Sequence, residues 1–158
     1  MQDLLQSWKF VRKQILQLIE PLSEKELLYT PPGLNNNMLW IFGHVVRSAE
    51  YLILKLSGNP LNFDQELDSY FAKGSSPSVW KSTTGLAERI KEGEKQYRLK
   101  LEKFLTEENL QLPLVEPYTT STGITLNTIG DSLGYVSLHE AIHLGQLQLY
   151  RKLAEAIN

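Results

Sequence analysis

The chain has 158 residues, with 16 Lys and Arg against 18 Asp and Glu, a formal net charge of −2 and no cysteine. This length suits one domain with a substantial core, so we expect a single domain over residues 1–158. The near-neutral balance gives no electrostatic footprint for nucleic acid or an anionic membrane surface. The lack of cysteine excludes disulfides, thiolate metal ligands and a cysteine nucleophile.

No targeting segment is evident. The N-terminus has no basic stretch followed by an apolar run, so no signal peptide is predicted. The longest nearly apolar run, Met38 to Val46, has nine residues, whereas a bilayer span needs about 20. We therefore expect a cytoplasmic protein that does not enter a membrane.

Four segments repeat apolar residues at the three- and four-residue steps of amphipathic helices. Asn36 and Asn37 are candidate N-caps of the second helix, and Gly58-Asn59-Pro60 is its predicted stop. In the first helix, Trp8 and Arg12 form an i,i+4 pair that we expect to stack at the surface. The predicted helices cover about residues 4–18, 37–56, 86–104 and 126–156.

The connections between these helices contain turn-forming residues. We expect a short helical turn at residues 23–28 and a long crossover with a short helical piece at 61–78. Residues 111–124, rich in Pro, Thr and Ser, are predicted to be a loop. No segment has the pattern of a β-strand. The prediction is an all-α fold, a four-helix bundle with at least one long crossover, because two connections are too long for tight hairpins.

The three histidines are the candidate functional residues. His139 and His143 stand four apart on the fourth helix, which puts them on one face. They can share one divalent ion, and His44 from the second helix would complete a three-nitrogen site with open positions. The alternative is a set of core histidines satisfied by hydrogen bonds. Unpaired buried polar groups cost about 1–3 kcal/mol each, so we favour the shared ion.

The segment His139-Glu140-Ala141-Ile142-His143 also matches the His-Glu-x-x-His pattern of zinc metalloproteases. Those enzymes take a third ligand from downstream. The residues after His143 include no histidine and a single acid, Glu155. No predicted strand is present to bind an extended peptide, so we do not favour a protease.

The motifs Trp40-x-x-Gly43-His44 and His139-x-x-x-His143-x-Gly145-Gln146 resemble those of the DinB-like four-helix-bundle metalloproteins, over essentially the whole chain. The resemblance implies a bundle with one long crossover, a zinc or nickel ion on His44, His139 and His143, and a homodimer. Characterised members of that superfamily are transferases and isomerases that use low-molecular-weight thiols, and many others have no assigned reaction.

Four further residues are candidates for the surroundings of the metal. Gln146 lies two turns beyond His139 and either lines the same face or makes a hydrogen bond between helices or subunits. Tyr51 and Ser132 each lie seven residues from a candidate ligand and should point inward, near the site or simply in the packed core. Glu140 either holds a ligand imidazole or is an exposed carboxylate.

Three functions remain open. The first is a metal-dependent transferase that activates a low-molecular-weight thiol for attack on a small-molecule substrate, with no protein thiol competing for the ion. The second is a metal-dependent hydrolase, because three nitrogens plus water is also the hydrolytic zinc arrangement. The third is a non-catalytic binding module in which the ion staples the second and fourth helices together.

Overall fold

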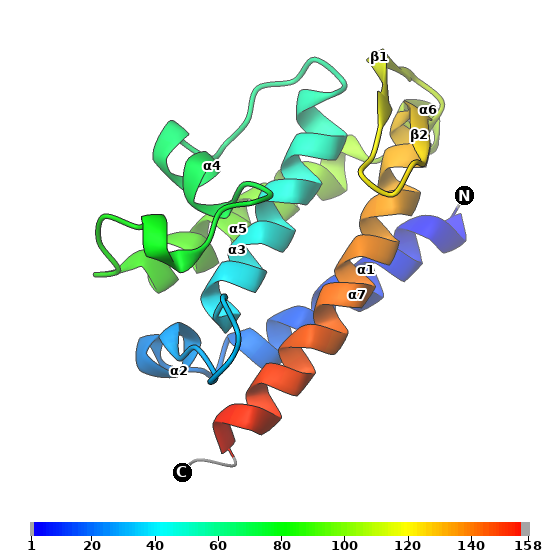
Figure 1. The fold of residues 1–158 in the computed structure, drawn as a ribbon. Helices are drawn as coiled ribbons and strands as arrows, with labels where there is room; N and C mark the ends of the chain where they lie inside the picture. Colours follow the sequence, from blue (N-terminus) through cyan, green and yellow to red (C-terminus); the bar gives the residue numbers. More distant parts are fainter. Residues whose placement is uncertain (1, 156–158) are drawn as a thin grey trace.

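Four long helices form the bundle in the computed structural model, which describes residues 2–155 (Figure 1). The predicted all-α four-helix bundle is confirmed. The predicted end of the last helix at Ala156 lies outside the described residues. The long helices are α1 (Gln2–Ile19), α3 (Met38–Glu50), α5 (Leu86–Phe104) and α7 (Ile129–Glu155).

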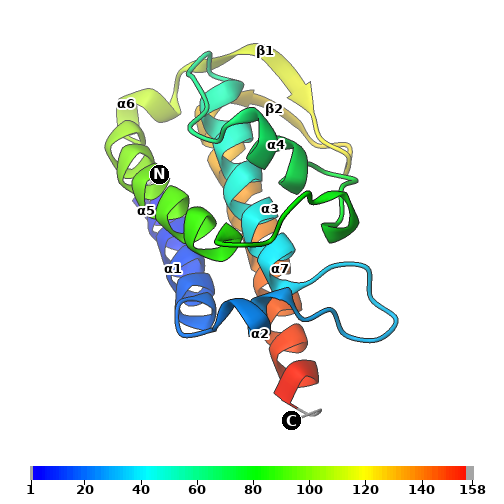
Figure 2. The same cartoon turned by 90° about the vertical axis from the view of Figure 1, so that its left-hand side faces the viewer.

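The direction of the helices explains the long crossover. Helices α1 and α7 run one way through the bundle, whereas α3 and α5 run the other way (Figures 1 and 2). Since α3 and α5 point in the same direction, the chain must return along the bundle between them. It does so through α4 (Gln65–Phe71) and the 3-10 turn η2 (Pro77–Val79), which confirms the predicted crossover with a short helical piece.

Helix α3 is the centre of the bundle. The Asn37 side chain accepts a hydrogen bond from the backbone N–H of Trp40 at 2.8 Å, so the predicted N-cap is confirmed. All residues of α3 except Arg47 are buried, as expected for a helix surrounded by others. Its last part is a π-helical turn, η1 (Tyr51–Lys55), and the predicted short helix after α1 is α2 (Glu24–Leu28).

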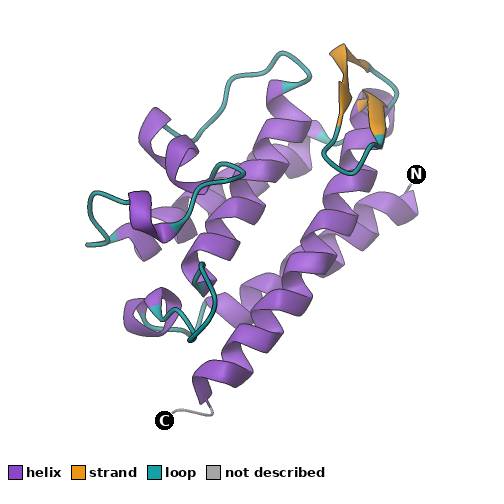
Figure 3. Cartoon of the chain, in the orientation of Figure 1, coloured by secondary structure: helices purple, strands orange, loops and turns teal. Residues whose placement is uncertain are grey.

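The predicted loop over residues 111–124 is wrong in part, because the chain forms a β-hairpin there (Figure 3). After the short helix α6 (Glu107–Leu110), strand β1 (Pro113–Thr119) pairs antiparallel with β2 (Thr125–Thr128). Strand β1 buries Leu114 and strand β2 buries Leu126. With one buried side chain in each strand, the alternation of apolar and polar residues that indicates a strand is a weak signal in the sequence. Helix α7 begins at Ile129 rather than near 126 because β2 uses the preceding residues.

The hairpin is held to the end of the central helix. The backbone N–H of Val115 donates to the carbonyl of Leu56 at 2.9 Å, and that of Ile129 donates to Leu112 at 3.1 Å. Strand β1 therefore lies beside η1, where α3 ends and α7 begins (Figure 1). Among the described residues, no helix is both long enough and apolar enough to cross a membrane.

Trp8 and Arg12 are buried, which corrects the prediction of a surface pair. The guanidinium of Arg12 donates to both carboxylate oxygens of Glu140, at 2.9 and 2.5 Å, and to Glu94 at 3.3 Å. The indole N–H of Trp8 donates to Glu140 at 3.0 Å. From the sequence, Arg12 is expected at the surface, because arginine is buried only where it has charged partners. Its partners lie on two helices that are distant in the sequence. This network joins α1, α5 and α7.

The first prediction concerns this network. Removing one partner of a buried ion pair leaves an uncompensated charge, so Glu140→Ala should lower the free energy of unfolding by about 3–5 kcal/mol. Chemical denaturation followed by circular dichroism measures the loss. The matched control is Glu155→Ala, which removes an exposed pair with Arg151 on the same helix and should change stability by less than about 0.5 kcal/mol. A loss below about 1 kcal/mol for Glu140→Ala would contradict the assigned role.

Candidate metal centre

The three histidines meet in the middle of the molecule, where α3 faces α7. Each of His44, His139 and His143 offers a ring nitrogen, and the three nitrogens lie within 4.8 Å of one another. The Nε2 atoms of His139 and His143 are 3.1 Å apart. Two nitrogens bound to one tetrahedral ion at about 2.0–2.1 Å would be about 3.3–3.4 Å apart, so the observed spacing is close to that of a shared ion.

His44 is held by two neighbours, Trp40 and Phe71, and Gly43 makes room for the second, which explains the Trp40-x-x-Gly43-His44 motif. The Trp40 ring stacks on the imidazole with a centroid distance of 4.8 Å and an interplanar angle of 7°. The Nδ1 atom of His44 lies 2.8 Å from the carbonyl oxygen of Phe71, at the end of α4. A Cβ on residue 43 would lie 2.4 Å from the Phe71 ring, so only glycine there lets Phe71 approach α3 closely enough.

The hydrogen bonds of His44 and His143 set their tautomers. A carbonyl oxygen can only accept, so His44 Nδ1 carries the proton and its Nε2 keeps a lone pair, which has only the Ser48 hydroxyl at 3.5 Å as a neighbouring donor. In the same way His143 Nδ1 donates to the amide oxygen of Gln146 at 2.8 Å, which leaves the Nε2 lone pair directed at His139 Nε2 and available to a metal ion. Such outer partners orient metal-binding imidazoles in known sites.

His139 lacks a comparable partner. Its Nδ1 is buried and has no hydrogen bond among the described residues, while its Nε2 faces His143 Nε2. If Nδ1 carries the proton in both rings, two Nε2 lone pairs face each other at 3.1 Å and repel. A cation shared by the three nitrogens removes the repulsion. The arrangement therefore fits a divalent ion.

Burial keeps these imidazoles in the neutral form that binds metals. Desolvation lowers the pKa of His44 to about 4 and that of His139 to about 3. It also lowers the pKa of His143, against the opposing effect of the Gln146 hydrogen bond. Neutral imidazole is the ligand form, so no proton has to be displaced at pH 7 before an ion binds.

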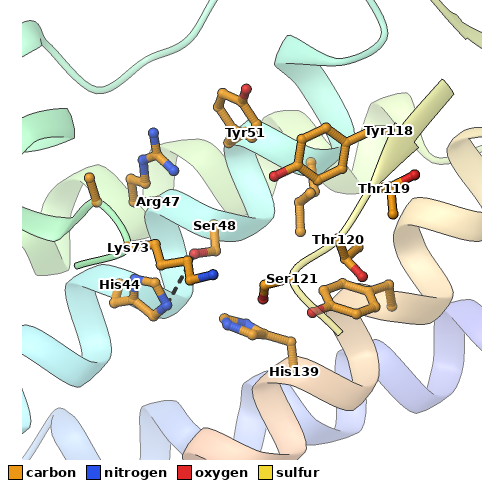
Figure 4. A pocket seen from close by; sticks show the side chains of 13 residues that line it. His44, Arg47, Ser48, Tyr51, Lys73, Tyr118, Thr119, Thr120, Ser121 and His139 are labelled. Atoms are coloured by element: carbon orange, nitrogen blue, oxygen red, sulfur yellow. Dashed lines mark hydrogen bonds between the residues drawn. The ribbon is translucent and has the colours of Figure 1, made fainter. Parts of the chain in front are cut away.

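A pocket of about 600 Å³ opens beside His44 and His139 (Figure 4). Its walls come from α3 and η1, from the segment after α4, from the hairpin and from α7. Two side chains in it are cationic, most others carry hydroxyl groups, and no carboxylate lines it. Its polar lining residues besides the histidines are Arg47, Ser48, Tyr51, Lys73, Tyr118, Thr119, Thr120, Ser121 and Tyr135.

The four further candidates fall in different places. Tyr51 lines the pocket, and Gln146 is the hydrogen-bond partner of His143. Ser132 is fully buried but does not line the pocket, as in the packing alternative. Glu140 is neither exposed nor bonded to an imidazole, because its carboxylate faces Arg12 and Trp8 on α1.

Several pocket residues were not predicted. Arg47 lies three residues after His44 and Tyr135 four before His139, so helical spacing alone could have identified both. Lys73 and the hairpin residues Thr120 and Ser121 follow no such period. Only the path of the crossover and the hairpin brings these three residues to the histidines.

Comparison with known proteins agrees with this geometry. A model of the DinB superfamily matches residues 7–147. The chain belongs to the DinB superfamily. The family that the two histidine motifs resemble is therefore confirmed.

The solved structures similar to this member of the DinB superfamily include two bacterial proteins. A conserved protein from Enterococcus faecalis has 14% sequence identity and a TM-score of 0.61, over 98% of this chain and 96% of that one. This likeness shows a shared fold. YfiT from Bacillus subtilis, described as a probable metal-dependent hydrolase with an unusual four-helix bundle topology, has 21% identity and a TM-score of 0.48, over 93% and 85% of the two chains. The comparison with curated proteins finds no match.

The second prediction is the loss of metal from histidine variants. The purified protein should hold about one divalent ion per chain, and His44→Ala, His139→Ala and His143→Ala should each largely abolish this, because two nitrogens bind an ion far more weakly than three. Elemental analysis after gel filtration measures the content. Gln148→Ala, exposed on the same helix, is the control and should keep the ion. Full metal content in His44→Ala would limit the site to α7.

Proposed function

We propose that this protein is a metal-dependent transferase that uses a low-molecular-weight thiol, with a zinc or nickel ion on His44, His139 and His143. One observation carries the proposal. The three nitrogens lie beside a pocket of about 600 Å³, and no fourth ligand from a His, Asp or Glu joins them among the described residues. Structural zinc sites are closed by four protein ligands, whereas catalytic sites leave a position for a substrate.

The chemistry divides between the ion and the pocket. A divalent ion held there would supply Lewis acidity that lowers the pKa of a bound thiol. In the transfer, the thiol sulfur forms a bond to an electrophilic carbon, the bond from that carbon to its leaving group breaks, and the thiol proton passes to water. The hydroxyls of Tyr51 and Tyr135 line the pocket and can donate hydrogen bonds to the departing group.

The pocket composition favours a thiol over water as the nucleophile. A hydrolase gains from a carboxylate that takes a proton from the attacking water. No carboxylate lines the pocket, and the nearest acid in the sequence, Glu140, is bonded to Arg12 and Trp8 instead. A thiol needs no such base, because its own acidity is far greater than that of water and the ion increases it further.

The third prediction tests the thiol. In cobalt-substituted protein, a small thiol should produce a new absorption band from direct sulfur–cobalt bonding, because the site offers an open position. His139→Ala, which removes a ligand, should lack the band. A spectrum that does not respond to millimolar concentrations of several thiols would contradict the transferase. Hydrolysis of ester or amide substrates by the same protein would then indicate the hydrolase, and no turnover at all would indicate the binding module.

The proposed enzyme would act as a homodimer built on α7. Exposed apolar side chains recur on one face of this helix, namely Leu138, Ile142, Leu149 and Leu153. Their steps of four and seven residues place them in one stripe. The first two are more than 60% exposed. Exposed apolar patches of this kind mark interaction sites, which supports contact between two copies of α7.

The fourth prediction concerns this interface. Wild-type protein at tens of micromolar should sediment as a dimer of its 18.1 kDa chain. Leu149→Lys should shift it to monomer, because an ammonium group in an apolar interface pays a desolvation cost. Leu99→Lys, on the exposed side of α5, is the matched control and should remain dimeric. A wild-type protein that sediments only as monomer would contradict the proposed assembly.

A further inference from the structure

The charged side chains that line the pocket beside the histidines all have the same sign. Of the charged side chains that line it, Arg47 and Lys73 are cationic and none is anionic. The chain as a whole carries slightly more acids than bases. A pocket with two cations and no carboxylate is therefore a local feature that the overall composition does not explain.

Lys73 has no structural partner that accounts for it. No hydrogen bond or ion pair involves its ammonium group among the described residues, and Figure 4 shows the side chain extending into the pocket toward His44 and His139. It stands two residues after Phe71, whose carbonyl oxygen holds His44 Nδ1. The same short segment thus positions a candidate metal ligand and a cation.

Arg47 is only partly neutralised. Its Nε donates to Asp68 at 2.8 Å, and its guanidinium lies over the Tyr51 ring with a distance of 4.7 Å to the centroid. Asp68 does not line the pocket. Stacking and the single ion pair fix the plane of the guanidinium and leave its two terminal nitrogens without a hydrogen-bond partner among residues 2–155. Guanidinium groups held this way are suited to carboxylate and phosphate.

Hydroxyl donors complete the cationic wall. Ser48 is one turn from His44 on α3, and Thr120 and Ser121 come from the hairpin. Hydroxyl groups and cations together can surround an oxyanion with donors, whereas a cationic substrate would find no acceptor carboxylate here. The complementary substrate is an anion.

We infer that the pocket holds an oxyanion subsite, formed by Lys73 and Arg47, that binds a carboxylate or phosphate on the substrate while the reacting atom lies at the three histidines. This inference rests on the proposed function for the identity of the reacting atom. The class of substrate is thus a small thiol or electrophile that carries an oxyanion. Charge, as well as the reacting atom, determines which compounds bind.

The test compares two thiols that differ in charge alone, 3-mercaptopropionate and its neutral amide, in cobalt-loaded protein. The sulfur–cobalt band gives both dissociation constants. The acid should bind at least about fivefold more tightly, the value of one ion pair worth about 1 kcal/mol. Lys73→Gln should remove most of this preference without changing the binding of the amide, and Lys73→Glu should reverse it. Lys73 is exposed, so neither variant disturbs the core.

The control variant is Lys103→Gln, an exposed lysine on α5 that does not line the pocket, and it should keep the wild-type preference. Equal binding of acid and amide would overturn the inference. A preference for the acid that is unchanged in Lys73→Glu would also overturn it, because the carboxylate would then bind the metal rather than the protein cations.

A second measurement separates this inference from the proposed function. If no thiol produces a band, calorimetry with succinate and with inorganic phosphate on the metal-loaded protein tests the subsite alone. Binding of either anion that is lost in Lys73→Glu would retain the subsite and reject the thiol, and the anion that binds identifies carboxylate or phosphate as the group. No binding of either anion would overturn the subsite as well.

Discussion

The buried contact between Arg12 and Glu140 is the constraint on which the site depends. Successive residues of a helix are about 100° apart, so the face of α7 that holds Glu140 against α1 and α5 determines where the neighbouring residues point. With Glu140 bonded to Arg12 and Trp8, His139 and His143 are turned toward α3. A rotation of α7 that moved the histidines away would separate Glu140 from Arg12 and leave the buried guanidinium with only its longer contact to Glu94. The cost of an unpaired buried charge therefore holds the orientation of two candidate ligands.

The third candidate ligand, His44, is positioned by different contacts, which connect the candidate metal site to the pocket. His44 is clamped between the Trp40 ring and the Phe71 carbonyl, and Gly43 creates the space that Phe71 requires. The chain that leaves Phe71 then brings Lys73 into the pocket. A movement of this segment would change both the orientation of His44 and the position of the Lys73 ammonium group. Binding of an ion at the histidines should therefore affect binding of a ligand at Lys73, and the reverse. The hairpin closes the opposite wall and is tied to the end of the central helix through Leu56.

Much of the molecule could be predicted from the chain alone because the signals were local or periodic. The four amphipathic helices follow from apolar spacing, the start of α3 from Asn37, and the crossover from the length of the segment between helices. The meeting of His44 with His139 and His143 could be expected because only three histidines exist and all lie on helix faces directed inward. The helices and the cap are thus encoded by neighbouring residues, and the histidine cluster by the small number of histidines and their positions on the helix faces.

Tertiary structure alone decided the features that depend on distant partners. The hairpin shows too few inward side chains for its pattern to be recognised, and it is stabilised by contacts with η1 and α7. In the sequence, Arg12 and Glu140 have the character of surface residues, because a charged side chain is buried only where it is paired with an opposite charge. Their pairing becomes evident only in the folded structure. Lys73 reaches the histidines because α4 returns along α3. The sequence by itself thus determined the helices and the three candidate ligands, whereas the buried ion pair, the walls of the pocket and its charge arise only when segments far apart in the chain are packed together.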